Sequence, residues 1–270
     1  MNQATRTIDE AFVYSCSFKE ERGLEPFVPE NLLAYQISGE THVYHQGGII
    51  VLKKDQLLLA RKNQLANSIK IPATDREYKV ISLIFSKVRL QQYALTNSIR
   101  CDQKYQGDGM LLLESDKYFS TYFLSLLPYV EQSRPLNEKL ARIKISEAIE
   151  LILQQDPGLK NILFDFSEPG KIDLDEFMQN NFQYNTSIET FAKLTGRSLA
   201  GFKRDFMKTF NMSPRKWLME KRLSEAYHLI KQKKQNPTEV YLDLGFENLT
   251  HFYRAFKQKF GATPKEIQSQ

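Results

Sequence analysis

The sequence predicts an α+β multidomain protein, with a β-sandwich and a helical pair in its first part and only helices in its second part. Three observations lead to this fold class. The chain has 270 residues, more than one compact domain usually needs. Short β-rich runs fill the chain up to about residue 115, and helical spacing replaces them from Lys117 onward. The net charge is −1 over residues 1–170 and +6 over residues 171–270, so the second part also differs in its chemistry.

Five runs in the first part have the composition of strands. They cover residues 12–18, 32–37, 49–52, 57–60 and 78–85. Turn residues such as Gly39, Gly48 and Pro72 separate them. Several short strands at this spacing favour a sandwich or a barrel, which we place at residues 1–116.

Two helices are expected over residues 117–168. The first has large residues at helical spacing, namely Tyr118, Tyr122, Leu126 and Tyr129, and Pro128 lies near its end. The second opens at Pro135, and one side of it carries Leu140, Ile143, Glu147 and Leu151, with Ala148 and Ile152 beside them. This apolar side suits packing on the sandwich or the assembly of a homodimer. A linker is expected at residues 168–171, which leaves 172–270 as a separate domain.

The last hundred residues contain an internal repeat with an offset of 50. Six positions are identical between 199–215 and 249–265: Leu199/Leu249, Phe202/Phe252, Arg204/Arg254, Phe206/Phe256, Phe210/Phe260 and Pro214/Pro264. So many identities in a short window indicate a duplicated supersecondary unit. Each copy has a short helix that ends at a glycine (Gly196 or Gly245), a brief turn and a longer helix. This arrangement is typical of a helix-turn-helix.

Helical geometry divides each longer helix into a buried side and an exposed side. The phenylalanines recur every four residues and form an apolar stripe, which Leu249 is expected to join in the second unit. At 100° per residue, other side chains project away from this stripe: Ala200, Lys203, Arg204 and Met207 in the first unit, and Thr250, Tyr253, Arg254 and Lys257 in the second. Nine Lys or Arg face three acids in residues 187–222, which fits either a DNA-binding surface or a solvated basic face. The arginine duplicated on the exposed side favours DNA.

Other classes of function lack their sequence features. No apolar stretch of about 20 residues is present, and residues 1–10 lack the apolar core of a secretion signal. The motifs GxSxG, GxxxxGK[ST] and HExxH are absent, so we expect no enzyme. Cys16 and Cys101 fit no metal-ligand spacing, and we interpret them as buried residues of a cytoplasmic protein. His42 and His45 are interpreted as surface or hydrogen-bonded histidines, with no metal and no cofactor.

Residues from about 174 to 267 resemble the DNA-binding domain of the AraC/XylS family of bacterial transcription regulators. The matching pieces are Phe191-Ala192 to Gly196, Phe202-x-Arg204-x-Phe206, Ser213-Pro214, Arg222-Leu223-x-x-Ala226, Leu244-Gly245-Phe246, Phe252-x-Arg254-x-Phe256 and Phe260-Gly261-x-Thr263-Pro264. The resemblance implies two helix-turn-helix units joined by one long helix, with RNA polymerase as a partner. The first part resembles the sensor half of this family in its layout, which implies a cupin-like sandwich. The layout is similar to that of the type III secretion activators, in which a regulatory protein acts on this half.

Two positions depart from the family pattern. Asn211 stands where the family usually has glycine, but asparagine tolerates a left-handed conformation, so the turn is expected to survive. Tyr241 stands where the family usually has a small residue, and it is expected to crowd the two helices of the second unit. The first unit is therefore expected to be the stronger base reader.

The sequence thus predicts a DNA-binding transcription regulator, most simply an activator, that a small molecule or protein controls through the first part. Two alternatives stay open: a cupin-type metal enzyme fused to a DNA-binding domain, and an architectural DNA-binding protein without a sensing role. The eight exposed residues named above are expected to face the bases of double-stranded DNA. Phosphate contacts are expected from Arg197, Ser198, Arg215, Lys216, Asn248 and Lys265.

Overall fold

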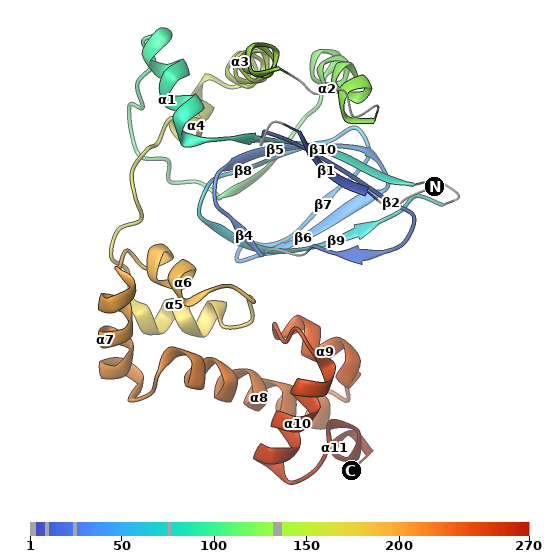
Figure 1. Cartoon of the computed structure of the whole chain (residues 1–270), viewed down its shortest axis with the longest axis vertical. Coiled ribbons are helices and arrows are strands. Elements are labelled where there is room, and N and C mark those ends of the chain that lie inside the picture. Colours follow the sequence, from blue (N-terminus) through green and yellow to red (C-terminus); the bar gives the residue numbers. More distant parts are fainter. Residues whose placement is uncertain (1–3, 9–10, 24–25, 75–76, 132–136, 270) are drawn as a thin grey trace. The chain divides into compact units, whose positions relative to one another are not determined.

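The computed structural model describes residues 4–8, 11–23, 26–74, 77–131 and 137–269 (Figure 1). The chain forms two compact units, Met1–Ser167 and Glu168–Gln270, which we call unit 1 and unit 2. Residues 165–173, which include the expected linker, have no helix or strand. Pro135, which was expected to open the second helix, lies outside the described residues.

Unit 1 contains two antiparallel sheets (Figure 1). Its strands are β1 (Ala4–Ile8), β2 (Phe12–Ser17), β3 (Glu21–Arg22), β4 (Phe27–Val28), β5 (Asn31–Ser38), β6 (Glu40–His45), β7 (Gly48–Leu52), β8 (Leu57–Ala60), β9 (Gln64–Ile71), β10 (Tyr78–Phe85) and β11 (Met110–Leu113). One sheet has the order β1-β2-β10-β5-β8-β11, and the other has the order β3-β9-β6-β7 with β4 paired to β9. All five predicted runs are strands, and the sandwich expected from them is confirmed.

The central strands of the six-stranded sheet, β5, β8 and β10, contribute side chains to a core on each face, which explains their apolar runs. In β8, Leu57 and Leu59 join the core on the helical side of the sheet, while Leu58 and Ala60 join the core between the two sheets. The alternation of a β-strand therefore places every side chain of this short run in a core.

The helices described in unit 1 are α1 (Lys87–Thr96), α2 (Lys117–Glu131), α3 (Glu138–Gln155) and α4 (Lys160–Leu163), with a short 3₁₀ turn at Pro157–Leu159. Helices α1, α3 and α2 lie side by side over the six-stranded sheet (Figure 1). Their buried residues form one core with β2, β5, β8 and β10. The helical pair therefore belongs to the same compact unit as the sandwich.

The buried side of α3 overlaps the predicted one but is rotated from it. The side chains that reach the core are Ala141, Ile145, Ala148, Ile149 and Ile152. Leu140 and Leu151 are only half-buried, and Ile143 is 54% exposed. Leu140 and Leu151 still pack against this core, and Ala148 and Ile152, which were expected beside the predicted stripe, lie within it.

The last residues of unit 1 are tied to the sandwich by polar contacts. Arg61 donates a 2.7 Å hydrogen bond to Asp165, whose side chain is 7% exposed. The Asn31 amide donates to the carbonyl oxygens of Ile162 and Leu163. The chain is thus held to the sheet up to the point where unit 2 begins.

Every regular element described in unit 2 is a helix. Its helices are α5 (Leu174–Asn181), α6 (Ile188–Leu194), α7 (Leu199–Phe210), α8 (Pro214–Gln232), α9 (Pro237–Asp243), α10 (Leu249–Phe260) and α11 (Pro264–Ser269). The long helix α8 contacts α7 near its start and α9, α10 and α11 along its length. Double helix-turn-helix architecture is therefore confirmed, with 19 residues in the connecting helix.

Among the described residues, no helix is both long and apolar enough to cross a membrane. Cys16 and Cys101 are free and half-buried, so the expectation that both are buried is wrong.

Candidate nucleic-acid interface

Each helix-turn-helix is built around a glycine that no other residue can replace without strain. Gly196 and Gly245 have φ values of +65° and +75°, in the left-handed region. A Cβ on Gly196 would lie 2.3 Å from the carbonyl carbon of Gly170, and one on Gly245 would lie 2.4 Å from the carbonyl oxygen of Gln183. The two turns therefore pack tightly against preceding segments in equivalent ways.

The helices that follow these turns begin at matched caps. The Ser198 hydroxyl accepts a hydrogen bond from the Gly201 amide at the start of α7. The Asn248 side chain accepts one from the His251 amide at the start of α10. Asn211 ends α7 with φ +50°, which confirms that it takes the place of glycine. These caps fix the bounds of α7 and α10.

The apolar backs of α7 and α10 bind the same connecting helix. Phe202, Phe206, Phe252 and Phe256 are fully buried. Trp217 of α8 packs against Phe206 and Phe210, with ring centroids 5.7 and 4.7 Å apart. Ten residues along α8, Tyr227 packs against the corresponding residues Phe256 and Phe260, at 6.3 and 4.7 Å. The two ends of α8 thus hold the two long helices.

The front of α7 carries the four residues predicted to face bases. Ala200, Lys203, Arg204 and Met207 are all exposed, with 49% of Met207 accessible. They lie opposite the buried phenylalanines, as the helical spacing requires. This front combines two cations with two small or flexible apolar groups.

The front of α10 differs from its prediction in two side chains. Thr250, Arg254 and Lys257 are exposed, but Tyr253 is half-buried with its ring edge-on to Phe252 at 5.8 Å, and burial raises its pKa. Leu249, which was expected in the core, is 36% exposed at the first position of the helix. The expectation that Leu249 is buried is therefore wrong.

Tyr241 is accommodated by stacking. Its ring lies 6.2 Å from the ring of Phe252 with an interplanar angle of 28°. The half-buried tyrosine thus contributes to the core between α9 and α10, where it was expected to crowd them.

The structure gives Arg197 an internal role in place of the predicted phosphate contact. Its side chain is only 9% exposed and its Nε donates to Asp205 at 3.0 Å. Its Nη1 donates to the carbonyl oxygens of Thr195 and Ile172. Hydrogen bonds from Arg197 and Lys171 hold the pKa of Asp205 below its usual value. Arg197 therefore ties the first turn to the segment before α5.

The other residues predicted to contact phosphates are exposed near helix starts. Ser198 and Asn248 cap α7 and α10, while Arg215, Lys216 and Lys265 lie in the first turns of α8 and α11. Ser213 precedes α8, and its exposed hydroxyl makes no capping hydrogen bond there. Its counterpart Thr263 instead forms a reciprocal capping pair with Glu266.

In unit 1, His42 and His45 each have a hydrogen-bond partner close in the sequence. The His42 ring is 2.7 Å from Glu40, and His45 accepts a hydrogen bond from the Gly47 amide. Within the described ranges, no group of three His, Cys, Asp or Glu residues could hold a metal ion.

Two protein families match the chain. A family described as "Helix-turn-helix domain" matches residues 191–270, and one described as "ExsA N-terminal regulatory domain" matches residues 31–162. The HTH-type transcriptional regulator ExsA of Pseudomonas aeruginosa is 24% identical over 232 residues, which are 84% of this chain and 82% of that protein. The virulence regulon transcriptional activator VirF of Yersinia enterocolitica is 29% identical over 95 residues, or 35% of each chain. The solved structure of apo ToxT from Vibrio cholerae is 12% identical and aligns over 98% of this chain and 99% of its own with a TM-score of 0.46.

Proposed function

The chain belongs to the AraC/XylS family of bacterial transcription regulators, and we propose that it is a sequence-specific activator of transcription that is controlled through unit 1. The observation that carries this proposal is the duplicated helix-turn-helix, whose two long helices have buried phenylalanine backs and exposed basic fronts. Helices of this kind read base edges in the major groove.

The first helix-turn-helix is the stronger base reader in this proposal. Arg204 lies at the middle of the exposed front of α7 and is the candidate for a bidentate contact with guanine. Lys203 lies beside it, while Ala200 and Met207 are apolar groups that suit contact with thymine methyls. In the second helix-turn-helix, Arg254 takes the equivalent place, and the exposed Leu249 adds an apolar group at the start of α10.

Phosphate contacts are assigned to the exposed groups at the helix starts. Arg215 and Lys216 supply two positive charges, and the free hydroxyl of Ser213 supplies a donor beside them. Lys265 takes the corresponding position after the second unit. Such contacts position a protein on DNA and give binding its dependence on salt.

Control through unit 1 is supported by the match of residues 31–162 to a regulatory domain. The effector is a small molecule or a protein, and RNA polymerase is the partner through which an activator acts. The site of action is then the bacterial cytoplasm. We also propose that α2 and α3 mediate self-association, because Ile143 of α3 presents a large apolar side chain to solvent.

The proposed function is tested with sites that the full-length protein selects from random DNA. Arg204→Ala is expected to weaken binding by about 1–3 kcal/mol and to relax the preference at one base pair. Lys139→Ala in unit 1 also removes one positive charge, at a position far from Arg204 in the sequence. It is the control for the change in net charge. A uniform loss on all sequences with a shallower salt dependence would make Arg204 a phosphate contact. Unchanged affinity and preference would contradict its assignment to the interface.

A further inference from the structure

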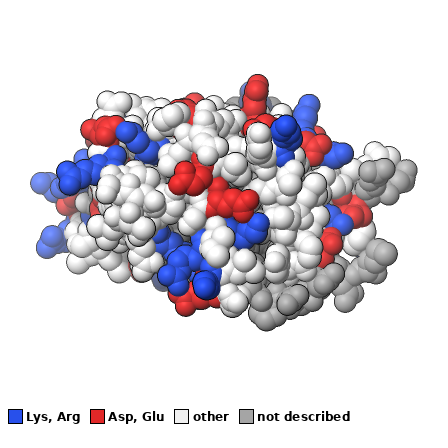
Figure 2. Space-filling view, turned by 90° about the horizontal axis from the view of Figure 1, so that it is seen from above, with Lys and Arg blue, Asp and Glu red and all other residues white. Residues whose placement is uncertain are grey.

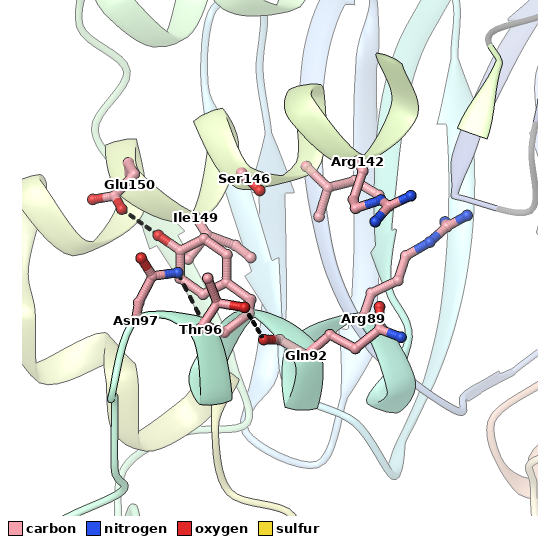
Figure 3. Close-up of a pocket in the computed structure, with 10 residues that line it drawn as sticks. Arg89, Gln92, Thr96, Asn97, Arg142, Ser146, Ile149 and Glu150 are labelled. Carbon is pink, nitrogen blue, oxygen red and sulfur yellow. Dashed lines mark hydrogen bonds between the residues drawn. The ribbon is translucent and has the colours of Figure 1, made fainter. Parts of the chain in front are cut away.

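Unit 1 contains a pocket of about 580 Å³ between α1 and α3, which we call the α1–α3 pocket (Figure 3). The side chains of Ile145 and Ile149 are buried and form its apolar floor. Polar side chains of the two helices line its walls. This pocket is independent of the surfaces assigned to DNA, and all of its residues belong to unit 1.

One end of the pocket is positively charged. Figure 3 shows the side chains of Arg89 from α1 and Arg142 from α3 extending toward the same end. The contact of Arg142 with Glu138 is an exposed pair at 3.6 Å, which is weak competition for a ligand. Planar guanidinium groups bind carboxylates through paired hydrogen bonds. This end is therefore suited to a carboxylate.

The opposite end carries a negative charge. Glu150 of α3 accepts a hydrogen bond from the Tyr93 hydroxyl of α1 (Figure 3). Burial and this bond raise the pKa of Tyr93, so its hydroxyl stays protonated and remains a donor at neutral pH. The carboxylate keeps further acceptor positions beyond this bond, which suit an ammonium group.

Unused polar groups lie between the two ends. Gln92 and Ser146 line the pocket from opposite helices. The Gln92 carbonyl oxygen accepts a hydrogen bond from Thr96, but among the described residues neither the Gln92 side-chain amide nor the Ser146 hydroxyl has a hydrogen-bond partner. Both can donate to and accept from a ligand backbone.

Seen from above, the face of the molecule in Figure 2 mixes Lys and Arg with Asp and Glu over a largely uncharged surface, which does not suit a polyanion.

We propose that the α1–α3 pocket binds a small zwitterion of the short-peptide class, with its carboxylate at Arg89 and Arg142 and its ammonium group at Glu150. The length of the pocket sets the size of this ligand. Arg142 and Glu150 mark the two charged ends on α3, and between them the helix advances about 12 Å at 1.5 Å per residue. An extended peptide covers about 3.3–3.6 Å per residue, so about three residues fit between the charged ends.

The test is a titration of the full-length protein with trialanine, N-acetyl-trialanine and trialanine amide, followed by NMR of isoleucine methyl groups. Trialanine is expected to shift the methyl signals of Ile145 and Ile149 in a saturable manner. Acetylation removes the ammonium group and amidation removes the carboxylate. Each change is expected to weaken binding about 10- to 100-fold, as expected for the loss of charge-assisted hydrogen bonds.

Two variants test which charged group of the peptide binds at each end of the α1–α3 pocket. Arg142→Gln is expected to abolish the preference for trialanine over its amide, and Glu150→Gln the preference for trialanine over its acetylated form. Lys139→Gln changes a charge on α3 outside the pocket and is expected to keep both preferences. Equal binding of the three peptides, or no saturable shift at tens of millimolar trialanine, would overturn the proposal. Since no DNA is present, the outcome is independent of the proposed function.

Discussion

The guanidinium of Arg222 donates a 3.0 Å hydrogen bond to the carbonyl oxygen of Gly245, the glycine in the turn of the second helix-turn-helix. The same group donates to the carbonyl oxygens of Phe182 and Tyr184, in the loop between α5 and α6. Burial lowers the pKa of Arg222 to about 10, so the side chain remains charged at neutral pH. One residue of the connecting helix thus joins the segment before the first helix-turn-helix to the turn of the second.

Removal of this side chain is expected to destabilise unit 2. Arg222→Ala leaves three carbonyl groups without their donor, and we expect a loss of about 2–4 kcal/mol in the free energy of unfolding. Trp217 is the single tryptophan of the chain and is packed in unit 2, so its fluorescence reports this transition in the full-length protein. Arg215→Ala, at an exposed position of α8, is the control and should stay within about 0.5 kcal/mol. A similar small effect of Arg222→Ala would refute the structural role.

Arg197 and Arg215 are expected to behave in opposite ways. Arg197→Ala removes internal hydrogen bonds, so it should lower the stability of unit 2 by about 1–3 kcal/mol. It should leave the salt dependence of DNA binding unchanged. Arg215→Ala should preserve stability but reduce the slope of log affinity against log salt by about 0.9, the value for one phosphate contact. Stability is measured by urea denaturation, and the salt dependence by DNA binding at several salt concentrations. If Arg197→Ala changed the salt dependence and Arg215→Ala lowered the stability, the two roles would be the reverse of those assigned.

Unit 1 is expected to lose stability in acid partly through Asp165. Burial alone would raise the pKa of this carboxyl, but hydrogen bonds from Ser167 and the charge of Arg61 hold it below the ordinary value of 3.8. The folded state therefore binds this proton less readily than the unfolded state. The contribution to stability is complete above pH 3.8 and is lost as the pH falls through the lowered pKa.

Asp165→Asn tests this pH dependence. Circular dichroism should show a smaller difference in urea midpoint between pH 7 and pH 3 for unit 1 of the variant than for that of the wild type. Trp217 fluorescence reports unit 2 in the same samples and should not change. An identical acid dependence in the variant would show that Asp165 makes no such contribution.

Self-association is expected to depend on Ile143. This residue is 54% exposed on α3, and Ile143→Asp would place a charge in an apolar contact. We expect the dimer dissociation constant to rise at least about tenfold, equivalent to 1.4 kcal/mol, as measured by sedimentation equilibrium. Leu95→Asp changes another exposed apolar residue, on α1, and is the matched control. A wild-type chain that stays monomeric at high concentration and on DNA would contradict the proposal.

The fold of unit 2 could be predicted because its signals are local in sequence. The glycines at positive φ and the capping residues each act within a few positions, and the repeat shows that the same local pattern occurs twice. The role of Arg197 could not be predicted in this way. Its guanidinium is withdrawn from solvent by Asp205 and by the carbonyl of Ile172, a contact that exists only in the folded unit. The exposure of Leu249 likewise depends on how α10 packs.

In unit 1, the spacing of apolar residues in the sequence does not decide which side of a helix is buried. Helix α3 has two adjacent stripes of apolar residues, and only the packing on the sheet decides which of them is buried. Helix α1 was missed because it buries only Leu90 and Ala94, too few for a clear pattern. The one local signal for it was Ser86, whose side chain caps the helix by accepting a bond from the Arg89 amide. The α1–α3 pocket could not be predicted without this helix.

The central claim is that both helix-turn-helix units of one chain read consecutive major-groove segments of DNA. The connecting helix α8 has 19 residues and is about 28 Å long at 1.5 Å per residue, and with the turns at its ends it can hold α7 and α10 about one turn of DNA apart. The decisive measurement compares the affinity of unit 2 for its selected site with that for a site that has five base pairs inserted between the two segments. The insertion adds half a turn of DNA and places one segment on the far side of the duplex. The affinity should therefore fall at least about tenfold, to that of a single helix-turn-helix. Equal affinity for the two sites would contradict the claim and show that a single unit reads DNA.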